Sequence, residues 1–220
     1  MDIKLSTFWP NIWEATIQTL QMVGFSLLFS LLIGIPLGII LVITRPGNII
    51  GNQTFFFILN GVINFLRSIP FIILMVAIIP FTRIIIGTTI GTAAAVVPLV
   101  VYAAPYIARL VESSLLEVSP GVIEAAEAMG AKPHQIIFRV LVPEAFSSLI
   151  LNITIATIGL IGASAMAGAV GGGGLGDLAI AYGYQRFETD IMIVTVLLLV
   201  VFVQLVQSFG NKLSKTSRRR

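Results

Sequence analysis

The stretch "IEAAEAMGAKPHQIIFRVLVPEA", Ile123 to Ala145, gathers three glutamates, a lysine, an arginine and the chain's only histidine into an otherwise strongly apolar sequence. Local signals predict its shape. Ser119 suits the N-cap of a helix, Pro120 suits its first position, and Gly130 suits its end. We therefore expect a short helix, followed by a second segment that leads into the next long apolar run.

That second segment begins at Pro133, and Pro143 marks the start of the following run. A helix of about ten residues is marginal in water by itself, so it needs a surface to pack against. Small residues give it a surface with almost no side chains: Ala125, Ala126, Ala128 and Gly130. Glu124 and Glu127, three residues apart, add acceptors on one face. This pattern fits either a contact for another protein or a connector that lies on the lipid surface.

The composition indicates an integral membrane protein. Of 220 residues, 57% are hydrophobic and only 10% are charged, and the mean hydropathy is +1.02. A soluble domain of this length needs more charge to cover its surface. The absence of cysteine excludes disulfides, and a single histidine excludes a histidine metal cluster.

Long apolar runs predict an all-α domain, residues 1–220, with five membrane-spanning helices. A span needs about 20 mostly apolar residues. Four runs meet this without charge, and a fifth is interrupted only by Arg67. The expected spans are 15–43, 54–80, 84–112, 144–167 and 190–211, and the opening stretch falls in the connection 113–143.

The distribution of Lys and Arg predicts the orientation, because basic residues concentrate on the cytoplasmic side. Five spans place the termini on opposite sides. One side would hold Lys4, Arg83 and Arg186, and the other Arg45, Arg109, Lys132, Arg139, Lys212, Lys215, Arg218, Arg219 and Arg220. We therefore expect the N-terminus outside and the C-terminus inside, with the basic tail as a lipid-surface anchor and not a nucleic-acid site.

The opening stretch resembles the EAA loop of ABC importer permeases, Glu-Ala-Ala-x3-Gly-x9-Ile-x-Leu-Pro. The matching residues are Glu124, Ala125, Ala126, Gly130 and Pro143, while Val140 and Val142 replace the Ile and Leu. In that family the loop forms a coupling helix seated in a cytoplasmic ATPase. The resemblance implies a type I importer fold and gives these five residues an ATPase-coupling role.

Three longer segments are similar to the methionine ABC transporter permease family: "NFLRSIPFIILMVAIIPFTRIIIGTTIG", "YAAPYIARLVESSLLEV" and "SAMAGAVGGGGLGDLAIAYGY". This similarity implies a multi-pass subunit of a bacterial cytoplasmic membrane. It also implies a second copy of the chain, cytoplasmic ABC ATPase subunits that use ATP and Mg²⁺, and an extracytoplasmic methionine-binding protein. No cofactor is expected on this chain.

Three residues are candidates for the pathway or its gate: Arg67, Ser164 and Met166. An arginine near a span centre is costly in lipid, so Arg67 should face protein or the pathway, although an interhelical pair or a bend at Ser68 to Pro70 would also accommodate it. Met166 could narrow a pathway or fill a packing gap.

The glycine-rich "GAVGGGGLGD" contains a G-x-G-x-x-G spacing, but no strand precedes it, so a nucleotide site is excluded. A flexible outer loop and a close-packed turn facing the binding protein both fit, and Asp177 and Arg186 could contact that protein.

Other functions remain open on the residues alone. The substrate could be another small amino acid or thioether, and a stand-alone channel or secondary transporter is a weaker alternative. The chain offers no catalytic constellation, which argues against an intramembrane enzyme.

Overall fold

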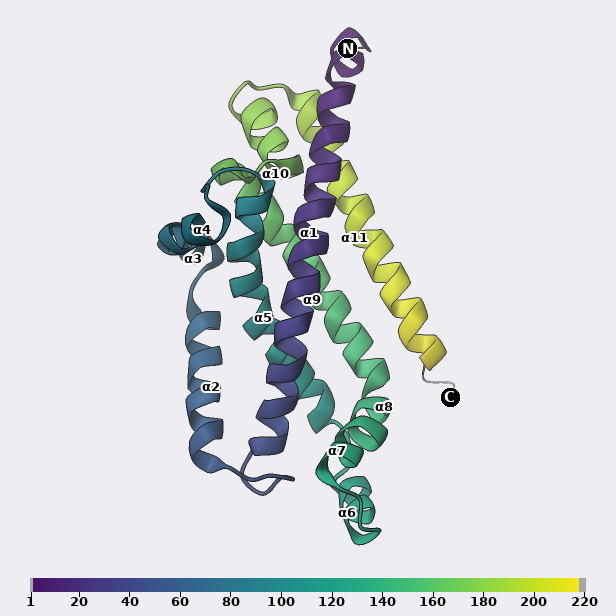
Figure 1. Ribbon diagram of the computed structural model, residues 1–220. Coiled ribbons are helices and arrows are strands. Elements are labelled where there is room, and N and C mark those ends of the chain that lie inside the picture. Colours follow the sequence, from purple (N-terminus) through teal and green to yellow (C-terminus); the bar gives the residue numbers. More distant parts are fainter. Residues whose placement is uncertain (1, 218–220) are drawn as a thin grey trace.

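The computed structural model describes residues 2–217, and every regular element within them is a helix. Figure 1 shows a bundle of long, roughly upright helices with short helices near both ends and α3 and α4 at one side. In chain order the elements are α1 (Asp2–Thr44), α2 (Gln53–Ser68), α3 (Phe71–Ala77), α4 (Ile79–Ile86), α5 (Thr92–Leu116), α6 (Pro120–Ala128), α7 (Pro133–Ile136), η1 (Ile137–Leu141), α8 (Val142–Glu144), α9 (Phe146–Ala167), η2 (Gly168–Gly172), α10 (Gly174–Leu178), η3 (Ala179–Tyr184) and α11 (Thr189–Ser217).

Within these residues, four helical segments are long and apolar enough to cross a membrane: Phe8–Thr44, Thr92–Leu116, Phe146–Gly172 and Thr189–Ser217. The pair α2 and α3 would make a fifth crossing. The first segment spans 37 residues, roughly 55 Å at the rise of an α-helix, so it extends well beyond a hydrocarbon core of about 30 Å.

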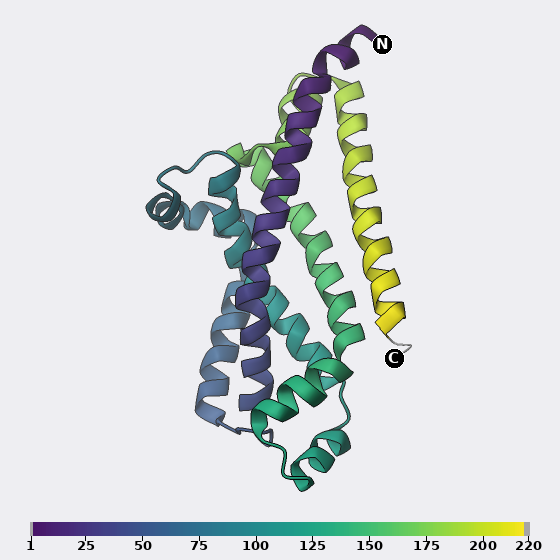
Figure 2. The ribbon, with the colours of Figure 1, turned by 45° about the vertical axis from the view of Figure 1, so that its right-hand side comes forward.

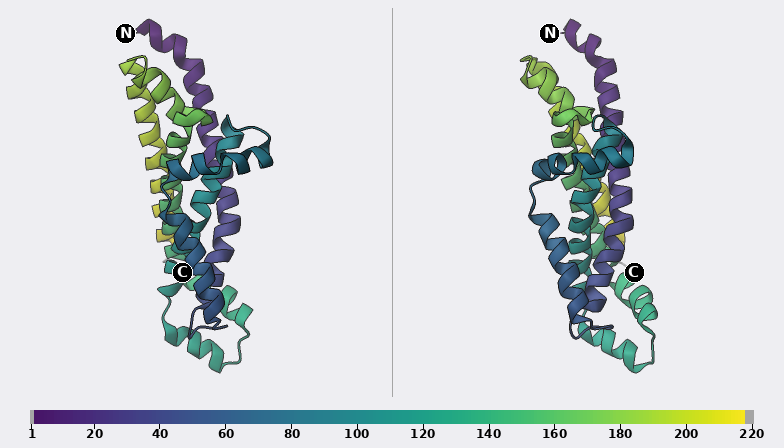
Figure 3. Two further views of the ribbon diagram at one scale, coloured as in Figure 1. Left: turned by 90° about the vertical axis from the view of Figure 1, so that its left-hand side faces the viewer. Right: turned by 60° about the vertical axis from the view of Figure 1, so that its left-hand side comes forward.

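The second crossing is a broken helix. α2 and α3 meet at 101°, with Pro70 as the N-cap of α3. Figure 3 shows α3 and α4 running across the bundle while α2 rises along it. The span expected over 54–80 therefore contains a sharp change of helix direction. The break lies within the Ser68 to Pro70 region that sequence reasoning had allowed as a bend.

The third crossing begins later than the expected residue 84. α4 ends at Ile86, and the chain turns through Gly87 and Gly91, whose φ angles are +83° and +96°, before α5 begins at Thr92. Only glycine adopts such angles without strain. The apolar run that begins at Ile84 therefore contains the end of α4 and the turn before α5. The absence of charge did not reveal where the third crossing begins.

α1 packs directly on α5 at two glycines. A Cβ on Gly34 would lie 2.8 Å from the carbonyl oxygen of Ala104, and one on Gly38 would lie 2.6 Å from that of Ala108. Small residues four apart let two helix backbones approach closely. Gly34 and Gly38 therefore form a close contact between α1 and α5.

The last helix, α11, is held to α9 by small and hydroxyl residues. A Cβ on Gly210 would clash with Thr154. Below it, the hydroxyls of Ser147 and Ser214 are 2.7 Å apart. Figure 2 shows α11 beside α9 with its other side free.

The chain ends lie toward opposite ends of the bundle. In Figure 1 the N-terminal end of α1 is at one extreme, and α6 to α8 form the other, toward which α11 runs. The path is thus compatible with five passes.

Candidate functional site

The helix expected in the opening stretch is α6, Pro120–Ala128, with Ser119 at the N-cap position. Its end is a Schellman motif: the amide of Gly130 donates to the carbonyl of Glu127 at 2.8 Å, and that of Ala131 donates to Ala126 at 3.1 Å. Gly130 has φ +79°, as the C-terminal signal predicted. Ser119, however, makes no side-chain capping hydrogen bond.

One side of α6 is anchored in the protein core. Ala126 is 4% exposed and belongs to a buried cluster with Leu115, Val118, Ile136 and Leu141. This cluster joins the end of α5 to α6, α7 and η1. A force applied to α6 therefore acts directly on the end of α5 and on the segment that leads into α9.

The opposite side of α6 is exposed. Glu124, Ala125, Glu127 and Ala128 are all accessible, and neither glutamate forms a hydrogen bond or ion pair with any described residue. Both carboxylates border a groove of about 320 Å³ between α6 and the α1–α2 connection, whose other lining residues are Val42, Gly47, Asn48, Ile49, Leu115, Leu116, Val118, Pro120 and Ile123. The side chains are free to meet a partner.

Large apolar side chains lie uncovered near these carboxylates in the sequence. Met129 is 82% exposed, Phe138 66% and Val122 40%. All three lie in the connection between α5 and α9, at the end of the bundle away from the N-terminal end of α1. Exposed apolar groups beside unpaired acids indicate a surface that another protein covers.

Pro143 lies where the connection re-enters the bundle. It is exposed within α8, directly after the π-helical turn η1. A proline provides no N–H for the helical ladder, and a π-helical turn is one way in which a chain absorbs such a local irregularity. Pro143 thus contributes to the bend between α7 and α9.

Arg67 lies in the last turn of α2, next to the break. Its side chain is exposed, and its guanidinium carbon is 5.9 Å from the centre of the Tyr106 ring. It forms no ion pair with a described residue. This arginine therefore points out of the protomer, toward whatever covers α2 in the assembled protein.

Ser164 and Met166 occupy different environments on α9. Ser164 is fully buried, and its hydroxyl donates to the carbonyl of Ile161 at 2.8 Å. Met166 is 52% exposed. The structure does not bring either side chain together with Arg67, and Ser164 faces no open space in this protomer.

The glycine-rich segment is packed against the bundle. The amide of Gly174 donates to the Gln18 side chain at 2.7 Å, and that of Leu175 donates to the Thr19 hydroxyl at 2.9 Å. Gly176 is buried, and a Cβ there would meet Ala165. The close-packed turn is therefore the better of the two earlier interpretations. Asp177 is exposed.

Beside this segment, Arg186 lies over the ring of Tyr182, with its guanidinium carbon 4.3 Å from the ring centre.

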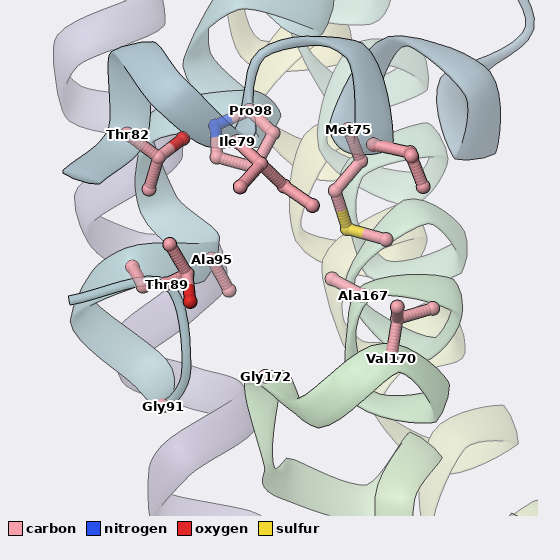
Figure 4. A pocket seen from close by; sticks show the side chains of 12 residues that line it. Met75, Ile79, Thr82, Thr89, Gly91, Ala95, Pro98, Ala167, Val170 and Gly172 are labelled. Atoms are coloured by element: carbon pink, nitrogen blue, oxygen red, sulfur yellow. The ribbon is translucent and has the colours of Figure 1, made fainter.

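A small cavity of about 40 Å³ lies where α3 and α4 approach α5 and η2 (Figure 4). It is mostly apolar, and Met75 and Val170 lie at one side of it. The cavity is too small for an amino acid in this conformation.

Sequence reasoning missed one group of polar residues. Arg109 contacts Glu112 on α5 and reaches across to Asn60 and Asn64 on α2. In the sequence, Arg109 served only as one of the basic residues that predict the orientation in the membrane. The signals were present in the spacing, because Asn60 and Asn64 are four apart and Arg109 and Glu112 three apart on their helices.

No group of three or more His, Cys, Asp or Glu side chains within residues 2–217 is arranged to hold a metal ion.

Comparisons with known proteins agree with this arrangement. Residues 34–219 match the family described as "Binding-protein-dependent transport system inner membrane component". A probable D-methionine transport system permease protein, MetI of Vibrio cholerae, is 52% identical over 199 residues, which cover 90% of this chain and 88% of the relative. The methionine import system permease protein MetP of Bacillus subtilis is 43% identical over 218 residues, covering 97% and 98%.

Solved structures give the same picture. One described as "Inward facing conformations of the MetNI methionine ABC transporter" has a TM-score of 0.93 and 46% identity, and the match covers 99% of both chains. An amino acid ABC transporter crystallised with histidines has a TM-score of 0.79 at 18% identity, which supports the fold alone.

Proposed function

Because the chain belongs to the family of binding-protein-dependent transport system inner membrane components, we propose that it is the membrane-spanning subunit of an ATP-driven methionine importer. Relatives that cover nearly its whole length are named as methionine or D-methionine permeases. The chain would work as a homodimer in the bacterial cytoplasmic membrane, with ABC ATPase subunits that bind ATP and Mg²⁺ on one side and a methionine-binding protein on the other.

The observation that carries the proposal is the construction of α6. One side of the helix is fixed in the cluster that contains Ala126 and Leu115. The other side exposes Glu124 and Glu127 without partners within the described chain. A connector that lay on the lipid surface would turn an apolar face toward the lipid, whereas the free side of α6 carries two carboxylates and small alanines. A coupling helix that fits into a protein cleft accounts for both.

The mechanism follows from these attachments. When ATP binding brings the two ATPase subunits together, each would displace the α6 seated in it. Because α6 shares a buried cluster with the end of α5 and with η1, the displacement would pass to α5 and, through α8, to α9. The two protomers would then alternate between inward-facing and outward-facing states. Hydrolysis itself belongs to the partner.

The coupling contact also defines the orientation we propose. α6 would face the cytoplasm, where ATP is available, and the glycine-rich segment with Asp177 and Arg186 would face the binding protein. Arg67 and Met166 are the pathway or gate candidates, since both side chains are exposed on the protomer. Ser164 is a weaker candidate because it is buried and bonded within its own helix.

The test is uptake of labelled methionine by cells that lack their own importer. Cells that express this chain with its ATPase and binding protein should accumulate methionine, and cells that lack any one of the three should not. The chain should also copurify with the ATPase. Uptake that persists without the ATPase would contradict the proposal and favour a channel or secondary transporter.

A further inference from the structure

An ionic group around the buried Glu112 links α5 to α2 and to the residue that follows α1, close to the coupling helix. Glu112 on α5 is 3% exposed and contacts Arg109, and Arg45, just after α1, approaches it at 3.9 Å. The same nitrogen of Arg109, Nη2, donates to the side-chain oxygens of Asn60 at 2.6 Å and Asn64 at 2.8 Å. We call these five residues the Arg109 network.

The geometry requires arginine at position 109. Nη1 faces the Glu112 carboxylate, while Nη2 has two hydrogens and meets two amide oxygens. A planar guanidinium presents these donors in a fixed fork, whereas the compact ammonium of lysine cannot serve both directions in the same way. The carboxylate in turn needs a cation because an unpaired buried charge is strongly destabilising.

α2 has few other attachments to its own protomer. Ile63 is its only buried residue, and it packs in a small cluster with Leu41 and Ala108. Phe56 and Leu59 of α2 are partly buried against this cluster, while other large apolar side chains of the helix, among them Phe57 and Phe65, are exposed. The Arg109 network is therefore the main polar connection between α2 and the bundle.

The position of the network along the chain suggests its purpose. Glu112 precedes the end of α5 at Leu116 by one helical turn, and α6 begins at Pro120. On the other side of the network, Asn64 precedes the break of the second crossing by about one turn. The network thus joins the end of α5, which leads into the coupling helix α6, to α2, which carries Arg67.

We propose that Arg109 is a positioning residue that fastens α2 to α5, so that α2 moves with the coupling helix during transport. This inference rests on the proposed importer function. The network would transmit the motion of α6 to the broken crossing. Without it, α5 would move while α2 lagged behind, and ATP would be hydrolysed with little transport.

The test uses the complete complex of permease, ATPase and binding protein in proteoliposomes. The informative variant is Asn60→Leu with Asn64→Leu, which keeps the Arg109–Glu112 pair and removes only the link to α2. The measured quantity is the amount of methionine imported per ATP hydrolysed. We expect this ratio to fall about tenfold, the scale of one or two lost charge-assisted hydrogen bonds. Arg109→Lys should lower it as well.

A matched control is Ser214→Ala, which removes a buried hydrogen bond between α11 and α9. That variant should leave the ratio unchanged. If the asparagine double variant also leaves the ratio unchanged, or lowers uptake and hydrolysis in the same proportion, the network has only a structural role and the inference is overturned. Failure of the unmodified complex to import methionine would instead refute the proposed function.

Discussion

At the scale of single residues, Gly130 shows how the coupling helix is ended. Its φ of +79° lies in the left-handed region, yet a Cβ built there would meet no atom within 4 Å. The glycine is therefore needed for backbone conformation and not for space. A β-branched side chain is strongly disfavoured at such an angle, whereas asparagine tolerates it.

We accordingly expect Gly130→Val to disrupt the end of α6 at a cost of about 1–2 kcal/mol, and Gly130→Asn to be tolerated. Gly130→Val should reach the membrane but copurify less ATPase, because the Schellman bonds to Glu127 and Ala126 would be lost. The measurement is the ATPase-to-permease ratio after purification. Equal ratios for both variants would show that the αL conformation is unimportant for coupling.

Arg67 leads to a second prediction at this scale. Its guanidinium is exposed, lies near the Tyr106 ring and has no ion pair with a described residue, so Arg67→Leu should remove little folding energy. We expect nearly normal amounts of inserted protein with a severalfold lower rate of methionine uptake. Arg83→Leu is the matched control, since Arg83 is another exposed arginine at a helix end. Unchanged uptake for Arg67→Leu would remove that residue from the pathway.

At the scale of elements, the contact between α1 and α5 depends on close approach of backbones. We expect Gly38→Ala to destabilise the protein by about 1–3 kcal/mol through overpacking, because its Cβ would lie 2.6 Å from a carbonyl oxygen. Gly24→Ala, on the same helix with nothing within 4 Å, should be neutral or slightly stabilising. The midpoint of thermal unfolding in detergent distinguishes the two, and equal midpoints would contradict the packing.

The sequence predicted the elements that local chemistry determines. α6 could be bounded in advance because Pro120 and Gly130 carry strong start and stop signals. The bend at Ser68 to Pro70 was one of the alternatives that the sequence allowed, but the angle of 101° between α2 and α3 was not predictable. The direction of α3 depends on how it packs, since its buried residue Phe71 shares a cluster with Leu99.

The candidate site was predictable to the same extent. The exposure of Glu124 and Glu127 followed from their spacing on one face of the expected helix. The Arg109 network did not, because it depends on which faces of α2 and α5 meet. Which helix faces meet depends on the tertiary structure. The distribution of Lys and Arg along the sequence uses Arg109 only to predict the orientation of the chain in the membrane.

At the scale of the whole molecule, the proposed orientation can be tested with single cysteines, since the natural chain has none. His134 lies in α7 and Gln185 follows η3 at the other end of the bundle, and both are exposed. A cysteine at His134→Cys should react with a membrane-impermeant thiol reagent only from the cytoplasm, and one at Gln185→Cys only from outside. Labelling of both from one side would contradict the five-pass path.

The central claim is that this chain moves methionine only when an ATPase drives it through α6. Its most direct test is uptake of labelled methionine into proteoliposomes that contain the permease, ATPase and binding protein, with ATP supplied on the ATPase side. The account predicts accumulation that requires hydrolysable ATP and is abolished by Glu124→Lys combined with Glu127→Lys. Methionine entry that proceeds equally without ATP, or at the unmodified rate in the double variant, would contradict it.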